Sequence, residues 1–286
     1  MKYFLLPAVV FIAVLGFLFL RPPKLPERKM IRVAVIGGMT MTGMWQALTA
    51  EFEAETNYKV EVVVTGPKQI LVEAFRKGEA DLLTMHSSDA TTDLVADGYG
   101  INMHPWTRNQ LVIVGPSSDP AHIKGMHDGA AALKKIAETQ SPFVDHFSNG
   151  AREVAHKMWA KAGIAPQGPW VIKDESAYPQ DILHYAEQHE AYIVVGRIPV
   201  IQGKMKSNKM EIMVENDPAM VRPYMVMEAN PVKFPHTNSI GAHALASYLV
   251  SDRAKRFLRE FGQRQPDGIP LFHPLPDVAP AEVKMQ

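Results

Sequence analysis

Residue types that carry covalent or metal chemistry are scarce or scattered in this sequence. None of its 286 residues is a cysteine, which excludes disulfides, Cys-ligated zinc, iron–sulfur clusters, a thiol nucleophile and a lipid-anchored Cys. Neither a G-x-S-x-G elbow nor an H-E-x-x-H helix occurs, and the eleven histidines are spread along the chain. We therefore predict that the protein is not an enzyme and that it holds no cofactor and no metal.

The elements that must position any binding group alternate between strands and helices. A β-branched run at 31–36, bounded by two glycines, is typical of a buried strand, and apolar residues then recur at helical spacing in Met44, Leu48 and Phe52. Further strands are predicted at 58–64, 81–85, 111–114, 171–172, 192–195, 210–214 and 224–229, and helices at 69–77, 88–97, 128–139, 149–162, 179–188 and 237–261, before an irregular tail from Gln263. This alternation predicts an α/β fold with a mainly parallel sheet.

Composition limits the class of protein further. Lys plus Arg and Asp plus Glu both number 30, so the formal charge is zero, which argues against a nucleic-acid partner. Hydrophobic residues make up 47% and charged residues 21%, as in ordinary globular proteins. The residues after the N-terminal segment number about 257, enough for one large domain or two lobes.

Residues 1–29 are predicted to lie outside the fold, as a signal peptide or an N-terminal membrane anchor. Phe4 to Leu20 is an apolar run, and as a transmembrane helix it would be about 25 Å long against a hydrocarbon core of about 30 Å. The run lacks small residues of the A-x-A kind at its end, which slightly favours the uncleaved anchor. Pro22, Pro23 and Pro26 then predict a stiff tether. Either interpretation predicts a periplasmic or extracytoplasmic protein, attached to the inner membrane if the segment is uncleaved.

Many short phrases resemble the tungstate-binding proteins of ABC importers, which have the type II periplasmic binding protein fold. They occur in the family's order between Arg32 and about Phe272. The phrases are Gly78 to Leu83, His86, Val95 to Asn102, Asn109 to Pro116, Asp119 to Gly125, Ala131 to Ala137, Trp159 to Ile164, Glu190 to Tyr192, Val214 to Pro218, Pro223-Tyr224, Ala229 to Pro231 and Pro235 to Asn238. Most of these residues belong to the scaffold, so they indicate fold and descent more than ligand.

The resemblance implies two α/β lobes joined by two hinge crossovers. Lobe one would comprise 30–112 plus 225–286, and lobe two 113–224. The hinge strands would be Asn109 to Pro116 and Pro223 to Ala229. The ligand would lie in the cleft between the lobes, beyond the carboxyl ends of the strands.

In lobe one, the resemblance points to Gly38, Thr40, Thr42, Lys68 and His86 as ligand-binding residues. The first three lie in the segment that matches the family's Thr/Ser-rich anion loop, where most hydroxyl positions have become apolar or glycine. Thr42 matches a family serine but could equally be a helix N-cap. Lys68 could be a cationic contact or a solvated lysine. His86 matches a histidine at the carboxyl end of a strand.

In lobe two, the resemblance points to Asn149, Arg152, Tyr178 and Arg197. The family signature Arg-Gly-Asp-Asp-Ser-Gly-Thr-His, whose arginine faces the anion, is shorter here and lacks that arginine. Arg152 stands where the family has histidine, and Arg197 matches a family arginine. Each arginine could instead lie on the surface. Tyr178 lies where the family is Gly-rich and could close over a larger or more apolar ligand.

The predicted function is therefore capture of an anionic ligand, tungstate-like or another small anion, for an ABC permease by an exported monomer. A hydrated dianion needs charge-assisted hydrogen bonds of about 1.5–3 kcal/mol each, and micromolar binding needs about 8 kcal/mol. The lost donors therefore predict a modified specificity. The alternative is a membrane-tethered, degenerate binding domain that acts as a sensor or protein-interaction module.

Overall fold

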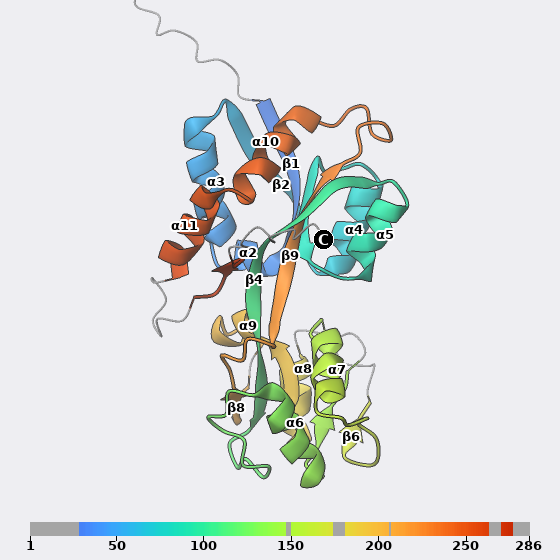
Figure 1. Ribbon diagram of the computed structural model, residues 1–286, viewed down its shortest axis with the longest axis vertical. Coiled ribbons are helices and arrows are strands. Elements are labelled where there is room, and N and C mark those ends of the chain that lie inside the picture. Colours follow the sequence, from blue (N-terminus) through green and yellow to red (C-terminus); the bar gives the residue numbers. More distant parts are fainter. Residues whose placement is uncertain (1–28, 147–149, 174–180, 206, 263–269, 277–286) are drawn as a thin grey trace, which may run out of the picture.

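The computed structural model describes residues 29–146, 150–173, 181–205, 207–262 and 270–276 (Figure 1). It is a mixed α/β fold of two lobes, and the first described strand begins at the far end of the larger lobe. The predicted signal peptide or anchor falls on residues outside the described ranges.

The larger lobe is built on one sheet with the strand order β10-β4-β9-β3-β1-β2. β1 pairs in parallel with β2 and β3, whereas β9 is antiparallel to β3 and β4. The strands are β1 (Lys29–Ile36), β2 (Tyr58–Gly66), β3 (Leu82–His86), β4 (Gly100–Pro116), β9 (Val221–Ala229) and β10 (His273–Pro274). The helices are α2 (Gly37–Met41), α3 (Met44–Glu55), α4 (Lys68–Arg76), α5 (Asp89–Ala96), α10 (Ser239–Leu249) and α11 (Asp252–Gly262).

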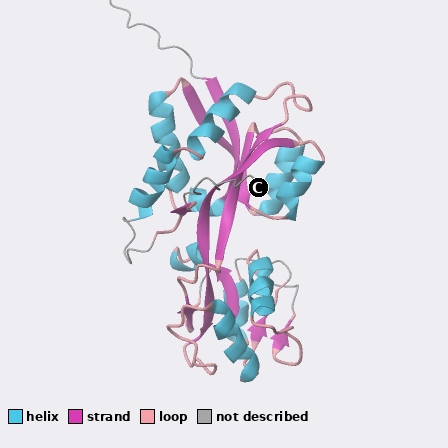
Figure 2. Cartoon of the chain, viewed as in Figure 1, coloured by secondary structure: helices cyan, strands magenta, loops and turns pink. Residues whose placement is uncertain are grey.

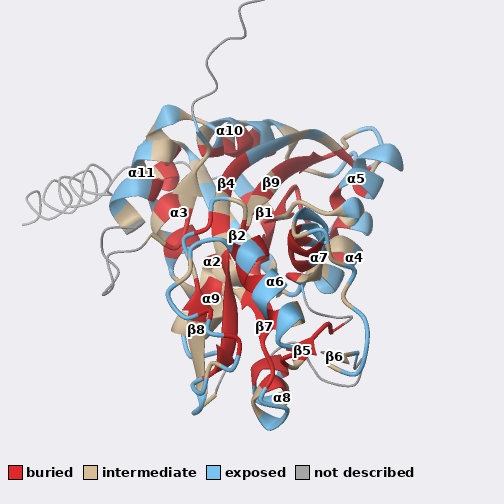
Figure 3. Ribbon diagram, turned by 60° about the horizontal axis from the view of Figure 1, so that its bottom comes forward, coloured by how far each residue is buried: buried red, intermediate tan, exposed pale blue. Residues whose placement is uncertain are grey.

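Helices cover both faces of this sheet, with α3 and α11 on one side and α4 and α5 on the other (Figure 2). β1 is buried from Ile31 onward except at Arg32, and β3 is buried from Leu82 to Met85, because helices cover both faces of the sheet. Figure 3 shows much of the central sheet in the colour of buried residues. The core of this lobe includes Trp45, Leu48 and Phe75, each at most 1% exposed.

The smaller lobe extends the same sheet through β7 and β8, which both pair with β4. A separate pair, β5 with β6, lies beside it. The strands are β5 (Phe143–Val144), β6 (Val171–Ile172), β7 (Ile193–Gly196) and β8 (Met210–Val214), and the helices are α6 (Gly129–Glu138), α7 (Arg152–Lys161), α8 (Ile182–Gln188) and α9 (Arg197–Ile201). Two hydrophobic clusters fill this lobe, apart from the core of the larger lobe.

The long strand β4 connects the two lobes. Its residues 100–110 pair with β9 in the larger lobe, and its residues 111–116 pair with β7 and β8 in the smaller one. β9 begins at Val221, directly after the smaller lobe, and runs into the larger one. Lobe boundaries at residues 112 and 224 remain our proposal.

The strand predicted at 111–114 is confirmed, but it is only the buried end of β4, whose earlier part is too polar to stand out. Other expectations were wrong. The large sheet is not mainly parallel, because among its described pairs only those of β1 with β2 and with β3 are parallel. The helix predicted over 237–261 is two helices, because the Ser251 hydroxyl bonds Tyr248 O (2.6 Å) and accepts from Ala254 N–H (3.3 Å), which ends α10 and starts α11. The tail is not wholly irregular, since β10 pairs with β4. The five-residue helices α2 and α9 were not predicted.

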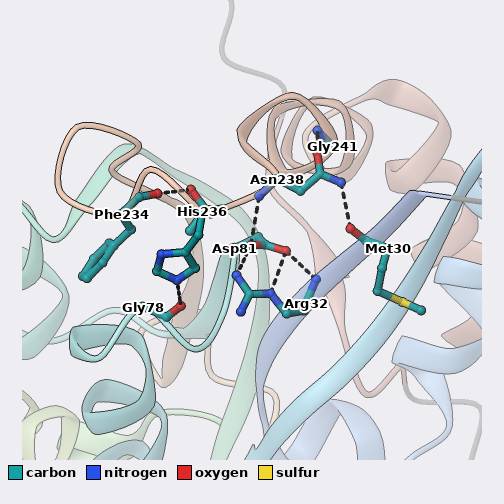
Figure 4. Close-up of polar contacts among 9 residues, drawn as sticks. Met30, Arg32, Gly78, Asp81, Phe234, His236, Asn238 and Gly241 are labelled. Carbon is teal, nitrogen blue, oxygen red and sulfur yellow. Dashed lines mark hydrogen bonds and ion pairs between the residues drawn. The ribbon is translucent and has the colours of Figure 1, made fainter.

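A buried polar contact fixes the start of the central strands (Figure 4). Asp81 is 1% exposed and accepts bonds from the Arg32 backbone N–H (2.7 Å) and from its Nη2 (2.6 Å). The backbone N–H of Asn238, the N-cap of α10, also donates to Asp81 (3.1 Å). This contact joins β1, the approach to β3 and α10.

Candidate functional site

The glycines that follow β1 lie beside Gly66 and Tyr224 at the end of the sheet that faces the smaller lobe. A Cβ atom on Gly37 would lie 3.4 Å from the Cα of Gly66, and one on Gly38 would lie 3.8 Å from the hydroxyl of Tyr224. Gly66 itself has φ +147°, a conformation that L side chains rarely adopt. The start of α2, the turn before α4 and β9 therefore meet at this point.

The hydroxyls of Thr40 and Thr42 are used within this local structure. Thr40 Oγ1 donates to Gly37 O (3.1 Å) and lies 2.9 Å from Thr65 Oγ1. Thr42 Oγ1 donates to the carbonyls of Gly38 and Met39 (both 3.1 Å). Thr42 is the C-cap residue of α2. The N-cap of α3 is Gly43, so Thr42 is not the N-cap that the alternative reading proposed.

His86 lies at the carboxyl end of β3, against the hinge strand β9. Its ring centroid is 4.3 Å from that of Tyr224, and its Nε2 is 2.8 Å from Nη2 of Arg222. A guanidinium can only donate, so Nε2 accepts and the ring proton is on Nδ1. Burial lowers the pKa of His86 well below its usual value, and the charges of Arg222 and Lys68 lower it further. His86 is therefore a neutral imidazole.

Arg222 connects the two lobes through neutral acceptors. Besides its bond to His86, its Nη1 donates to the carbonyl oxygen of Gly150, just before α7. Its Nε is buried and makes no hydrogen bond among the described residues. No Asp or Glu among the residues that the structure describes forms an ion pair with Arg222. Burial lowers the pKa of Arg222, opposed by Tyr224 and by the charge of Glu153.

Tyr224 presents its hydroxyl to the same place. The side chain is 1% exposed, and burial raises its pKa, against the opposing charge of Arg222. Over the described ranges the hydroxyl has no hydrogen-bond partner. It remains available as a donor.

Arg152 stands at the start of α7 and is already paired. Its Nε and Nη2 bond the two carboxylate oxygens of Asp145 at 2.8 and 3.2 Å, and His156 Nε2 lies 3.0 Å from the same carboxylate. Burial alone would raise the pKa of Asp145, but the bonds from His156 and Arg152 hold it below its usual range. The charge of Arg152 is thus largely neutralised within the smaller lobe.

Arg197 lies in a different polar group, at the start of α9. Its side chain is 4% exposed, and its Nε is 3.1 Å from Glu215 Oε2. Burial lowers the pKa of His273, and the charges of Arg108 and Arg197 lower it further. In the strand register, His273 is opposite Arg108, whereas Arg222 is opposite Asn109. Because neighbouring residues of a strand alternate between faces, Arg108 and His273 project from the face opposite to Arg222.

Lys68 is the first residue of α4 and acts electrostatically on His86. It also borders a surface hollow of about 410 Å³ between α4 and α5. That hollow contains no other residue of the group around Arg222, so it is not the cleft between the lobes. Asn149 and Tyr178 lie outside the described residues.

Thus the structure brings Gly38 and His86 together with Arg222 and Tyr224, and the charge of Lys68 acts on His86. Sequence reasoning missed Arg222 and Tyr224, although Pro223-Tyr224 carries part of the resemblance. The sequence signal that could have indicated this site was Arg222 itself, an arginine directly before the predicted hinge strand. The described residues contain no cluster of three or more His, Cys, Asp or Glu suited to a metal ion. They also contain no helix with the length and apolarity needed to cross a membrane.

Comparison with known proteins gives consistent matches. The family described as bacterial extracellular solute-binding protein matches residues 32–264. The tungstate-binding protein TupA of Peptoclostridium acidaminophilum is 31% identical over 239 residues, covering 82% of this chain and 81% of that protein. The solved tungstate ABC transporter structure from Geobacter sulfurreducens has TM-score 0.68 and 25% identity, covering 81% of this chain and 98% of its own. The tungstate-binding protein TupA of Desulfovibrio alaskensis G20 shares the fold, with TM-score 0.70, 24% identity and coverage of 87% and 100%. These matches confirm the resemblance found in the sequence phrases.

Proposed function

Because the chain belongs to the bacterial extracellular solute-binding protein family, we propose that it captures a small oxyanion between its lobes and presents it to an ABC-type importer. The relative and the 25% identical structure named above are described as tungstate-binding or as part of a tungstate ABC transporter. These descriptions support an anionic ligand for this chain.

The observation that carries the proposal is the guanidinium of Arg222, which has no carboxylate partner among the described residues. Arg222 is partly buried with its Nε fully buried, and burial of a charge without an opposite charge is unfavourable, so natural proteins normally pair such a group. Here the described partners are a neutral imidazole and a carbonyl oxygen. An oxyanion would supply the missing charge and an acceptor for the buried Nε.

The position of Arg222 also suits a ligand that brings the lobes together. Its side chain reaches His86 in the larger lobe and Gly150 in the smaller one. An anion held there would contact groups from both lobes, so it would favour the closed arrangement over the open one.

The residues proposed from the sequence contribute unequally to this site. Gly38 would let the ligand approach the backbone, His86 would offer its Nδ1–H, and Lys68 would add positive potential. Thr40 and Thr42 would contribute through the backbone, because their hydroxyls already have local partners.

On the side of the smaller lobe, Arg152 would contribute only weakly while Asp145 holds it. Arg197 would stabilise the hinge region through its ion pair with Glu215. Asn149 and Tyr178 remain proposed ligand contacts on the basis of the resemblance alone.

We further propose that the protein is an exported monomer that works with a permease, either released or held at the inner membrane by residues 1–29. N-terminal sequencing of the exported form distinguishes these cases. A start near residues 21–30 indicates release, whereas an intact Met1 indicates an anchor.

Calorimetry of the purified full-length protein with a panel of oxyanions tests ligand capture. We expect one or more anions to bind at micromolar concentrations and to reduce the radius of gyration in small-angle scattering. For the Arg222→Gln variant, the matched control is Arg253→Gln, because Arg253 pairs with Glu51 and Glu55 on the surface. Absence of heat and of compaction with every anion would instead favour the tethered sensor or interaction module.

A further inference from the structure

Asn109 is a buried polar side chain on β4, the strand that connects the two lobes. It is 3% exposed, and its Oδ1 is buried without a hydrogen-bond partner in the part of the chain that the structure describes. Proteins satisfy nearly all buried polar atoms, with protein groups, ordered water or a ligand. We propose that Asn109 is a further ligand-binding residue, whose side-chain amide donates to the anion beside the guanidinium of Arg222. The inference rests on the proposed function and adds one donor to the same site.

The strand register places Asn109 opposite Arg222. The two residues are Cα partners on the antiparallel strands β4 and β9, so their side chains project from the same face, with Cβ atoms about 4.5–5.5 Å apart. Tyr224 is opposite Thr107, two residues before Asn109, and therefore lies on this face as well. Asn109 thus shares a face with the guanidinium and the hydroxyl that the candidate site offers to an anion.

The same face of β4 is turned toward the start of α7 in the smaller lobe. Leu111, two residues after Asn109 and on the same face, belongs to the hydrophobic cluster that includes Ala151, the N-cap residue of α7. The carbonyl of Gly150, directly before it, accepts from Arg222. Asn109 therefore lies where the two lobes meet.

Two buried atoms on this face lack a described partner. Arg222 Nε is a donor and Asn109 Oδ1 is an acceptor. The amide can turn about its last bond and exchange Oδ1 for Nδ2, because no described residue bonds that oxygen. An oxyanion oxygen placed between the two side chains would then accept from both Nε and Nδ2. A neutral amide adds this donor without adding charge, so it suits a deprotonated oxyanion, which offers only acceptors.

Calorimetry of the full-length protein with tungstate, molybdate, sulfate and phosphate tests this role. Asn109→Leu keeps the approximate size of the side chain and removes its donors, so it should weaken binding of the tightest of these anions about tenfold or more. The unfolding temperature should stay the same or rise, because the variant removes a buried polar atom that no described residue bonds.

The matched control is Gln110→Met, at the next residue of the same strand. Oε1 of Gln110 is likewise buried without a partner in the described ranges. Because neighbouring residues of a strand alternate between faces, this side chain projects away from Arg222. The variant should therefore bind the anion as the wild-type protein does.

Asn109→Asp tests the geometry more sharply. A carboxylate opposite Arg222 would form the kind of ion pair that Asp81 forms with Arg32. It would take up the charge of Arg222 and could not donate to the anion. Binding should therefore weaken at least about 100-fold, while the unfolding temperature stays the same or rises.

The outcomes separate this inference from the proposed function. Wild-type affinity in Asn109→Leu or in Asn109→Asp would overturn the ligand contact and leave oxyanion capture standing. A loss of affinity that Gln110→Met shares, or that accompanies a fall in the unfolding temperature, would assign Asn109 a structural role and overturn the contact too. No binding of any of the four anions to the wild-type protein would overturn both.

Discussion

Arg32 and Arg222 both lie on strands of the larger sheet, but their surroundings differ. Arg32 donates its backbone N–H, Nε and Nη2 to Asp81 at 2.7, 3.4 and 2.6 Å (Figure 4). Within the described ranges, Arg222 donates only to His86 and to the carbonyl of Gly150. The first arginine is paired with a buried carboxylate, and the second has neutral partners.

This difference distinguishes an arginine that stabilises the fold from one suited to a ligand. A carboxylate partner uses up the positive charge in the folded protein, whereas an arginine with neutral partners leaves it for an outside anion. Arg152 and Arg197 resemble Arg32 in this respect. The partner of an arginine therefore says more about its role than its position in an aligned motif.

The largest expected effect concerns stability. Asp81→Ala should lower the free energy of unfolding by about 3 kcal/mol, the lower end for a broken buried pair, because the Arg32 side chain is 30% exposed. Arg222→Gln should leave that free energy unchanged or raise it, since it removes a charge that no described carboxylate pairs. Urea unfolding of both variants measures this contrast. Equal losses would mean that Arg222 is a structural residue like Arg32.

The next effect concerns the hydroxyl of Tyr224. Tyr224→Phe should weaken binding of the anion about fivefold to tenfold, the usual contribution of about 1 kcal/mol for one hydrogen bond. Unfolding should be unaffected, because the hydroxyl bonds no described residue. Calorimetry checks the affinity, and an unchanged value would remove Tyr224 from the site.

A smaller effect is the pH dependence that His86 contributes. Its pKa in the folded protein is depressed, so the unfolded chain takes up a proton first as the pH falls below about 6.5. Stability should therefore decline below that pH, and His86→Gln should flatten the decline. The pKa of His273 is also lowered. The His273→Gln variant should therefore flatten the decline as well, and its effect is compared with that of His86→Gln. A slope that His86→Gln leaves unaltered would contradict a neutral His86.

The smallest effect is expected at Arg152. Arg152→Gln should change the affinity for the anion by less than about threefold, because Asp145 already neutralises it. The Arg152 side chain is 38% exposed, so the substitution should lower the free energy of unfolding by less than about 1 kcal/mol. A loss of affinity as large as that of Arg222→Gln would show that the ion pair opens to admit the ligand.

The sequence predicted the elements whose patterns are strong. The β-branched run of β1 and the apolar spacing of α3 were confirmed, as was the alternation of strands and helices. The five-residue helices α2 and α9 are too short for a periodic pattern, and the first half of β4 is too polar. Such elements depend on tertiary pairing, which a local pattern does not contain.

The candidate site was harder to predict than the fold. Spacing and resemblance place His86 at a strand end, but they do not show that its partner is Arg222, 136 residues away. Nor do they show that Arg152 is bonded to Asp145. The role of a charged residue depends on the neighbours that folding brings to it.

The most direct test of the account is calorimetry of the wild-type protein and the Arg222→Gln variant with the same tightly bound anion, alongside their thermal unfolding. Loss of two charge-assisted bonds of about 1.5 kcal/mol each predicts at least about 100-fold weaker binding, with an unfolding temperature that stays the same or rises. Equal affinity in the two proteins would contradict the account, as would a fall in unfolding temperature as large as that of Asp81→Ala.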